Sequence, residues 1–179
     1  GTQVDFETGL TNDTTPTFEV SGDAGTLFEL LSGTTVLASG TNVTTLTPTT
    51  PLTDADYSLS VRSTDVAGNS SQSDLYFLTV DATAPVVPTI DLTAVSDTGQ
   101  SNTDNITNDR TLDLTGTAEA NTAIEVFNGV TSLGTTTANG SGAWSLTTGV
   151  LSNADYVLTV VSSDAAGNTS TSTALNVEL

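Results

Sequence analysis

Acidic residues are the only abundant side chains in this chain that carry a charge or can exchange a proton near neutral pH. Its 179 residues include 21 Asp and Glu and only two Arg, with no Lys, His or Cys. Nucleophile and base pairs built on His or Cys, and metals that need imidazole or thiolate ligands, are therefore excluded. What remains is carboxylate, amide, hydroxyl and carbonyl oxygen, the ligand set of hard cations. Calcium is the cofactor that this composition favours.

The net charge of −19 also limits the possible partners. Nucleic acids and anionic membranes are bound through cationic side chains that displace counterions, so we expect neither as a partner. The chain has no apolar run of roughly 18 residues or more and no basic, hydrophobic leader, so we expect no membrane insertion and an export signal elsewhere. We expect a monomer.

A long internal repeat organises the chain. Residues 52–71 read LTDADYSLSVRSTDVAGNSS and residues 151–170 read LSNADYVLTVVSSDAAGNTS, with twelve of twenty positions identical. A second match pairs LTNDT, from Leu10, with ITNDRT, from Ile106. The spacing suits two copies of one independently folded domain. We predict domains at residues 1–81 and 82–179, the first with a truncated opening strand.

Short runs in which apolar and polar residues alternate predict antiparallel strands with one buried face, and no amphipathic helix is evident. The fold class expected is all-β, with two tandem immunoglobulin-like Greek-key sandwiches joined end to end. The strands predicted in the first copy are Gln3–Phe6, Thr17–Ser21, Thr26–Leu31, Thr34–Ser39, Val43–Thr47, Tyr57–Thr64 and Ser73–Val80. Those predicted in the second are Val87–Thr93, Thr111–Gly116, Thr122–Asn128, Val130–Thr136, Ala143–Thr148, Tyr156–Ser163 and Thr171–Leu179.

The sixth strand of each copy carries a tyrosine two residues before a leucine. Tyr57 and Tyr156 match the corner tyrosine of immunoglobulin domains, whose hydroxyl bonds to nearby backbone. Leu59 and Leu158 take the place of the second cysteine of an antibody domain. In addition, Trp144 is expected in the core, and Leu75 and Phe77 on the outward face of the last strand of the first copy or under the linker.

Several motifs together resemble a known family. They are ADY before the sixth strand, DxAGN after it, TND before the second strand, GTAEAN before the third and DATAP at the joint. This combination is similar to the bacterial immunoglobulin-like extender domains of large repeat adhesins, many of them RTX-type and biofilm-associated. The resemblance implies a non-enzymatic segment of a calcium-rigidified stalk, outside the cell on a bacterial surface. Its partners would be neighbouring repeats of the same polypeptide.

Carboxylates are predicted to converge where the two domains meet. In this fold the loops after strands two and six share the entry pole, and the loops after strands one and five share the exit pole. Like charges brought close repel each other, whereas calcium binds about 6 to 8 oxygens. We therefore predict a calcium ion at the joint, held by Asp81, Glu119 and Asp164 with Asp13 next. Asp54 and Asp56 are expected to be surface turn residues.

Two further groups of acids are candidate metal ligands. Asp23 and Asp65 would form half of a joint with a preceding domain, although Asp65 and Asp164 could instead cap tight hairpins. The second copy also carries an insertion within residues 96–109, here called the acidic loop, which contains Asp97, Asp104 and Asp109. This loop is either a flexible acidic segment or, as the family resemblance implies, a calcium site closed by Asp97 and Asp104.

Two other classes of function stay open at this point. A calcium-dependent carbohydrate- or peptide-binding module is the main alternative, although only 5% of residues are aromatic and most of these fall at inward positions. A glycosidase needs two acids that flank a cleft, and no insertion that would form a cleft is evident. The stalk segment is the interpretation that the sequence favours.

Overall fold

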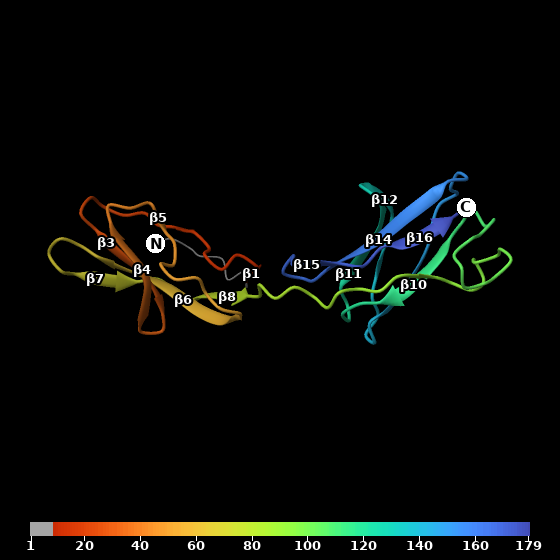
Figure 1. Ribbon diagram of the computed structural model, residues 1–179. Coiled ribbons are helices and arrows are strands. Elements are labelled where there is room, and N and C mark those ends of the chain that lie inside the picture. The colour runs from red at the N-terminus through yellow and green to blue at the C-terminus, as the bar shows by residue number, and fades with distance from the viewer. Residues whose placement is uncertain (1–8) are drawn as a thin grey trace. The chain divides into compact units, whose positions relative to one another are not determined.

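The computed structural model describes residues 9–179, which contain strands and turns but no helix. The chain divides into two compact units, Gly1–Thr83 and Ala84–Leu179, and each is described by itself. Figure 1 shows the strands of both units. The all-β fold class predicted from the alternating pattern is confirmed. The predicted strand Gln3–Phe6 lies outside the described residues.

Unit 1 is built from two sheets. The larger has the order β1-β8-β6-β3-β4, with β7 also paired to β6, and the smaller consists of β2 and β5. The first strand of the larger sheet runs parallel to β8, and its other pairs are antiparallel. The strands are β1 (Gly9–Thr11), β2 (Phe18–Glu19), β3 (Leu27–Ser32), β4 (Thr35–Thr41), β5 (Thr45–Leu46), β6 (Ala55–Thr64), β7 (Ser70–Gln72) and β8 (Tyr76–Val80).

Unit 2 repeats this arrangement with the same number of described strands, divided differently between its two sheets. One sheet has the order β12-β11-β14-β15, with β16 paired to β14, and the other has the order β13-β10-β9. An isolated parallel bridge between Ile106 and Glu178 takes the place of β1. The strands are β9 (Asp91–Leu92), β10 (Asp113–Thr117), β11 (Ala123–Asn128), β12 (Thr131–Thr137), β13 (Ala143–Thr147), β14 (Asp155–Ser163), β15 (Thr169–Thr171) and β16 (Leu175–Glu178).

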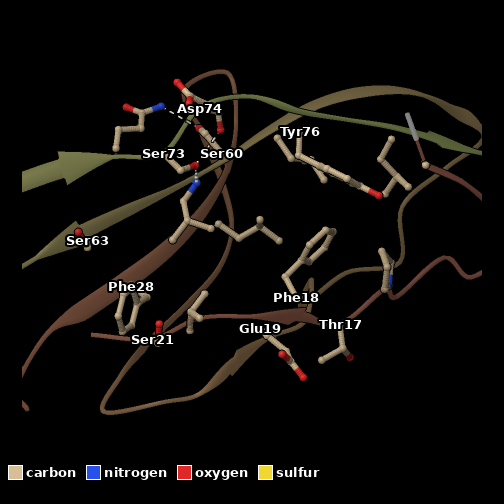
Figure 2. A pocket seen from close by; sticks show the side chains of 18 of the residues that line it. Thr17, Phe18, Glu19, Ser21, Phe28, Ser60, Ser63, Ser73, Asp74 and Tyr76 are labelled. Atoms are coloured by element: carbon tan, nitrogen blue, oxygen red, sulfur yellow. Dashed lines mark hydrogen bonds between the residues drawn. The ribbon is translucent and has the colours of Figure 1, made fainter. Parts of the chain in front are cut away.

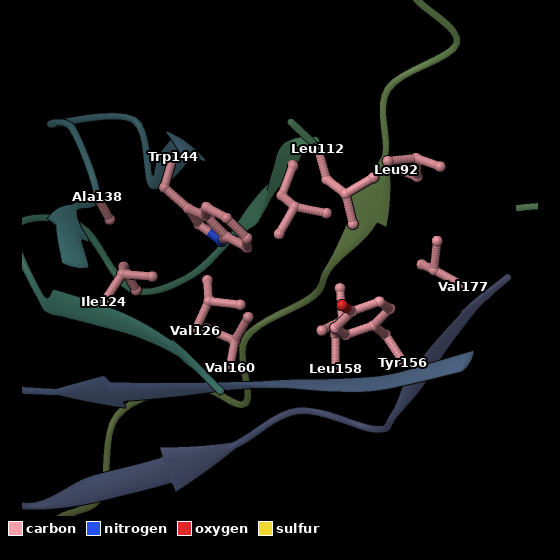
Figure 3. Packing of buried hydrophobic residues seen from close by; sticks show 11 residues of the cluster. Leu92, Leu112, Ile124, Val126, Ala138, Trp144, Tyr156, Leu158, Val160 and Val177 are labelled. Atoms are coloured by element: carbon pink, nitrogen blue, oxygen red, sulfur yellow. The ribbon is translucent and has the colours of Figure 1, made fainter. Parts of the chain in front are cut away.

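The core of unit 2 lies between its two sheets and is shown in Figure 3. Leu158 and Val160 project inward from β14 and have no exposed surface, and Trp144 of β13 is 3% exposed, which confirms its predicted core position. Unit 1 uses the matching residue Leu59, which is 1% exposed. In both units a buried leucine therefore occupies the position at which an antibody domain has its second cysteine, as predicted.

The tyrosine corner predicted from the repeat is present in both units. The Tyr57 hydroxyl donates to the carbonyl of Thr53 at 3.0 Å, and the Tyr156 hydroxyl donates to the carbonyl of Ser152 at 2.8 Å. Each bond ties the sixth strand to the turn that precedes it. At the start of β8, Leu75 and Phe77 flank Tyr76 and each is 45% exposed, so the predicted outward orientation is also confirmed.

Several predicted strands are shorter or divided in the structure, and Thr17–Ser21 and Val43–Thr47 are reduced to Phe18–Glu19 and Thr45–Leu46. Thr171–Leu179 separates into β15 and β16, and Ser73–Val80 begins only at Tyr76. A serine causes each break, because the hydroxyls of Ser172 and Ser73 accept bonds from strand amides that a backbone carbonyl would otherwise take. Val87–Thr93 is reduced to Asp91–Leu92, since Pro88 offers no amide to the ladder.

Candidate site on the linker and the acidic loop

Residues 81–86, here called the linker, are held at their first half by unit 1. The two carboxylate oxygens of Asp54 accept bonds from the linker: Oδ1 from the amide of Ala82 at 2.8 Å and Oδ2 from the hydroxyl of Thr83. The amide of Asp81 donates to the carbonyl of Thr11 at 2.9 Å. These bonds hold the exit of unit 1, and the one from Thr83 lowers the pKa of Asp54 below its ordinary value.

Unit 2 holds the second half of the linker from two directions. Glu119 Oε2, in the loop after β10, accepts a bond from the amide of Val86 at 3.2 Å. The hydroxyl of Ser170, in the β14–β15 hairpin, donates to the carbonyl of Pro85. The loops after the second and sixth strands therefore meet at the entry of unit 2, as the sequence predicted.

Asp65 and Asp164 occupy equivalent positions in the hairpins after β6 and β14. Each carboxylate receives both the main-chain and the side-chain amide of the asparagine four residues later, at 2.9 Å and 2.8 Å in both hairpins. Gly68 and Gly167 sit between them at φ +89° and +91°, a conformation that glycine adopts without strain. The capping role predicted for these acids is confirmed.

The same bonds shift the pKa values of these carboxyls. The side-chain amide of Asn69 lowers the pKa of Asp65, with a further contribution from the main-chain amide of Asn69. Partial burial opposes ionisation of Asp164, but the bonds from Asn168 outweigh it, so its pKa is also lowered. Both groups are therefore held as carboxylates, which can cap a hairpin and still carry negative charge at the pole.

Asp23 joins Asp65 at the corresponding pole of unit 1. Both acids line one polar hollow, together with Asn69, Ser21 and Thr26. This is the pairing that the sequence predicted for a half-joint. The hollow carries two carboxylates and several hydroxyl and amide oxygens, a donor set of the hard-cation type.

Asp13 and Asp109 hold matching turns in the two units. Asp13 Oδ1 accepts from the amide of Thr15 at 2.8 Å, and Asp109 Oδ1 accepts from the amide of Thr111 at 3.0 Å. Asp109 Oδ2 also accepts from the hydroxyl of Ser96 at 2.7 Å. The bond from the Thr111 amide and that from Ser96 lower the pKa of Asp109. Both acids therefore fix the start of the chain segment that enters the second sheet.

Asp97 is different from every other acid in the predicted set. It is 3% exposed, and its Oδ2 accepts from the amide of Asn105 at 3.1 Å, whereas its Oδ1 has no hydrogen-bond partner. A second buried oxygen without a partner, Thr93 Oγ1, belongs to the residue whose carbonyl accepts from the amide of Asp97 at 2.9 Å. A buried carboxylate oxygen without a partner is costly, and a bound cation would satisfy it. Asp97 and Thr93 therefore fit a hard cation.

The remaining acids are not gathered into one cluster. Asp104 Oδ1, in the acidic loop, accepts from the amide of Ile106 at 3.2 Å. Over residues 9–179, no group of three or more acids is placed so that it could hold a metal ion. The calcium ligands predicted from the sequence therefore stay predictions, with Asp97 the member that the local structure favours most.

Sequence reasoning brought Asp54 to the exit of unit 1 but gave it no role in holding the linker. Asp54 was expected to be a surface turn residue, and its counterpart in the second copy is Asn153. Its bond to Thr83 spans 29 residues, so no local pattern indicates it. The only available signal was its position in the ADY turn, which the fold brings to the exit of unit 1.

Comparison with known proteins agrees with this geometry. A family model described as a bacterial Ig-like domain matches residues 2–82 and matches again over residues 83–179. The chain belongs to this family. No curated protein matches it. Within the described part of these bacterial Ig-like domains, no helix is long and apolar enough to cross a membrane.

Several solved structures are similar to this bacterial Ig-like tandem, and the first of those described here supports the fold. The fibronectin(III)-like modules of CbhA from Clostridium thermocellum match with a TM-score of 0.60 at 15% identity, over 98% of this chain and 91% of that one. The BSP domain of a biofilm-associated protein matches with a TM-score of 0.40 at 18% identity, over 96% of this chain and 28% of that one. The D00-D0 domain of intimin matches with a TM-score of 0.34 at 15% identity, over 98% and 97%.

Proposed function

We propose that this tandem is a non-enzymatic extender segment of a bacterial surface adhesin, located outside the cell, in which calcium stiffens the array. The observation that carries the extender role is the attachment of the linker. Asp54 holds Ala82 and Thr83 to unit 1, and Glu119 holds Val86 to unit 2. Bonds at both ends of the linker leave only a short stretch of chain between the two attachments, which suits a spacer better than a long flexible tether.

The acids at the poles supply the calcium part of the proposal. Asp81, Glu119 and Asp164, with Asp13, are the proposed ligands of the joint within the tandem. Asp23 and Asp65 are the proposed ligands toward a preceding repeat, and their common hollow supports that role. Asp97, Asp104 and Asp109 are the proposed ligands in the acidic loop, together with Thr93, which precedes the loop. The unpaired oxygen of Asp97 gives this site the strongest support.

Calcium binding to the folded state alone would add substantial stability. At a free concentration about 1,000 times the Kd, each site contributes about 4 kcal/mol to the free energy of unfolding. This is comparable to the contribution of a typical disulfide, which this chain cannot form because it contains no cysteine. Calcium outside the cell would therefore stabilise each domain to an extent similar to a disulfide.

Thermal unfolding of the full chain in calcium and in chelator tests the acidic-loop site. Trp144 is the only tryptophan, so its fluorescence reports on unit 2 alone. We expect calcium to raise the unfolding temperature of unit 2, and Asp97→Asn to weaken calcium binding at least tenfold. Asp155→Asn, an exposed acid of the same unit, is the control. Equal unfolding temperatures of the unaltered chain in calcium and chelator would refute calcium binding by this loop.

Small-angle scattering tests the joint separately. We expect the full chain to show one extended maximum dimension in calcium and a broader distribution in chelator. The Glu119→Gln variant should lose this dependence on calcium, because a neutral amide replaces the carboxylate at the linker. The Asp97→Asn variant should keep it. An identical distribution with and without calcium would contradict calcium stiffening at the joint, whatever the acidic loop binds.

A further inference from the structure

Charged residues are absent from one stretch of each unit. None of the 21 acids and two Arg lies within residues 30–53 of unit 1 or within residues 126–154 of unit 2. These stretches contain β4 and β5 in unit 1 and β12 and β13 in unit 2. Each of the four strands lies at the end of a sheet, and the two strands of each unit are in contact. A chain with a net charge of −19 therefore has an uncharged edge in both units.

The edge strand of unit 2, β12, offers free backbone groups. Within residues 9–179 it pairs only with β11. Because the hydrogen bonds of an antiparallel pair alternate between residues, half of the amides and carbonyls of β12 face away from β11. A bulge interrupts its first half but leaves residues 134–137 in regular pairing, with Thr135 and Thr137 exposed. The strand contains no Pro, Lys or acid, the residues that commonly protect an edge.

The matching edge of unit 1 is closed by its own chain. The carbonyl of Leu37, at the bulge of β4, accepts bonds from the amide of Thr49 at 3.0 Å and from its hydroxyl at 3.2 Å. In unit 2 the loop after β13 is bonded differently, because the amide of Thr148 donates to the carbonyl of Leu112 at 3.0 Å. Leu133, the bulge residue of β12, receives no such bond from the described part of that loop. Unit 2 therefore keeps open an edge that unit 1 covers.

The charge distribution indicates which partner suits this edge. Two copies of the chain repel each other wherever their acids meet, which is over the other strands and loops. A cationic partner would be drawn to those acidic surfaces instead of to the uncharged edge. Glu125, opposite Thr135 on β11, is an acid that lies one strand further in. At β12 itself, two acidic chains can approach each other without placing carboxylates on the paired strands.

The cavity of unit 1 does not offer the same opportunity. It has a volume of about 650 Å³ and apolar walls that include Phe18 and Tyr76, as Figure 2 shows. However, the exposed acids Glu19 and Asp74 also belong to its lining. A second acidic chain would meet like charge there, so the cavity is a poorer contact between copies than the edge of unit 2.

We propose that β12 is a docking edge for a second copy of this chain, whose own β12 adds in antiparallel orientation to form one sheet across two chains. Strand addition supplies main-chain hydrogen bonds, and two such strands bring hydroxyl side chains next to each other. A strand of seven residues makes a small interface, so we expect one contact to be weak. Parallel tandems would strengthen it by making several contacts at once. This inference goes beyond the extender function and does not involve calcium.

Sedimentation equilibrium of the full chain in chelator tests the partner. At low ionic strength the net charge should keep the chain monomeric, in agreement with the expectation from the sequence. At about 1 M sodium chloride, where the Debye length is about 3 Å, we expect dimers and at least a tenfold higher association constant. A chain that stays monomeric at both ionic strengths, up to the highest soluble concentration, would overturn the proposal.

Two matched variants locate the contact. Thr137→Asp adds a carboxylate to β12, and Thr41→Asp adds one at the equivalent position of β4. Both threonines are exposed and lie opposite uncharged residues, Ala123 and Leu27, so the two variants differ only in the edge that they alter. We expect Thr137→Asp to lower the association constant at least tenfold and Thr41→Asp less than twofold. Equal weakening would mean that net charge governs association, and would contradict the assignment.

Hydrogen exchange of the unaltered chain gives a readout that does not depend on how a variant folds. In 1 M salt at high protein concentration, we expect the outward amides of β12 to exchange several-fold more slowly than at low concentration, since they become bonded to the second chain. The amides of β4 should exchange at the same rate at both concentrations. Dimers without slower exchange in β12 would contradict the proposed edge.

Discussion

Asp54 and Thr83 are joined by a hydrogen bond between a turn carboxylate and a linker hydroxyl, 29 residues apart in the sequence. With the bond from the amide of Ala82 to the same carboxylate, it makes the turn before β6 the anchor of the chain where it leaves unit 1. A surface aspartate thus acts on the connection between repeats, although nothing in its local sequence separates it from an ordinary turn residue.

Loss of the charge on Asp54 should loosen the linker without unfolding unit 1. In an Asp54→Asn variant we expect the amide of Ala82 to exchange with solvent several-fold faster, because a hydrogen bond to a carboxylate is stronger than one to an amide oxygen. Hydrogen exchange followed by NMR measures this directly. Asp56→Asn is the matched control, since Asp56 bonds to Thr79 within the sheet. Similar exchange in the two variants would argue against the anchor.

Acid should destabilise the hairpins after β6 and β14. The folded-state pKa values of Asp65 and Asp164 are lowered, so these groups contribute stability that is present above the unfolded pKa of about 3.9 and is lost as the pH falls through the lowered values. We expect unfolding temperatures to be level from pH 7 to about pH 5 and to fall below about pH 4. Asp65→Asn with Asp164→Asn should flatten the acid part of this dependence. An unchanged acid profile in the double variant would count against the caps.

Truncation of Leu158, which occupies the position of the antibody cysteine, should destabilise unit 2. Leu158 has no exposed surface, and Leu158→Ala removes a buried side chain from the centre of the unit 2 core. We expect the free energy of unfolding of unit 2 to fall by about 2 to 5 kcal/mol. Denaturant unfolding followed by Trp144 fluorescence measures it. Val157→Ala, on the outward face of the same strand at 51% exposure, should cost less than about 1 kcal/mol.

Loss of the serine hydroxyl at the break in the last strand should destabilise unit 2 more than unit 1. The hydroxyl of Ser172 accepts from the amide of Val160, which is completely buried, so Ser172→Ala leaves that amide without a partner. We expect a loss of about 1 to 3 kcal/mol in the free energy of unfolding of unit 2. Ser73→Ala in unit 1, where the bond to Val61 is exposed, should cost less. Equal losses would mean that burial does not set the energy of this contact.

The repeat decided most of the fold in advance. Alternating runs around Tyr57 and Tyr156 set which face of each sixth strand is buried, because side chains of a strand point to opposite sides in turn. The corner tyrosines, the core position of Trp144 and the exposed Leu75 and Phe77 follow from that same periodicity. The breaks in the strands do not follow from the periodicity. Ser172 and Ser73 look like ordinary strand residues in the sequence, but their hydroxyls interrupt the ladder of backbone hydrogen bonds.

For the candidate site, the sequence by itself determined the kind of chemistry, because a chain without His or Cys and with 21 acids offers only oxygen ligands. Through the strand order it also predicted that Glu119 and Asp164 lie near the linker. Only the tertiary structure decided which carboxylates are already satisfied. Asp65, Asp164 and Asp109 hold backbone and side-chain donors, whereas Asp97 keeps a buried oxygen unpaired and Asp54 reaches across to Thr83. The donors to Asp65, Asp164 and Asp109 lie only two to four residues away, whereas Thr83 lies 29 residues from Asp54. The bond of Asp54, and the lack of a partner at Asp97, therefore depend on the folded chain and not on the spacing of residues.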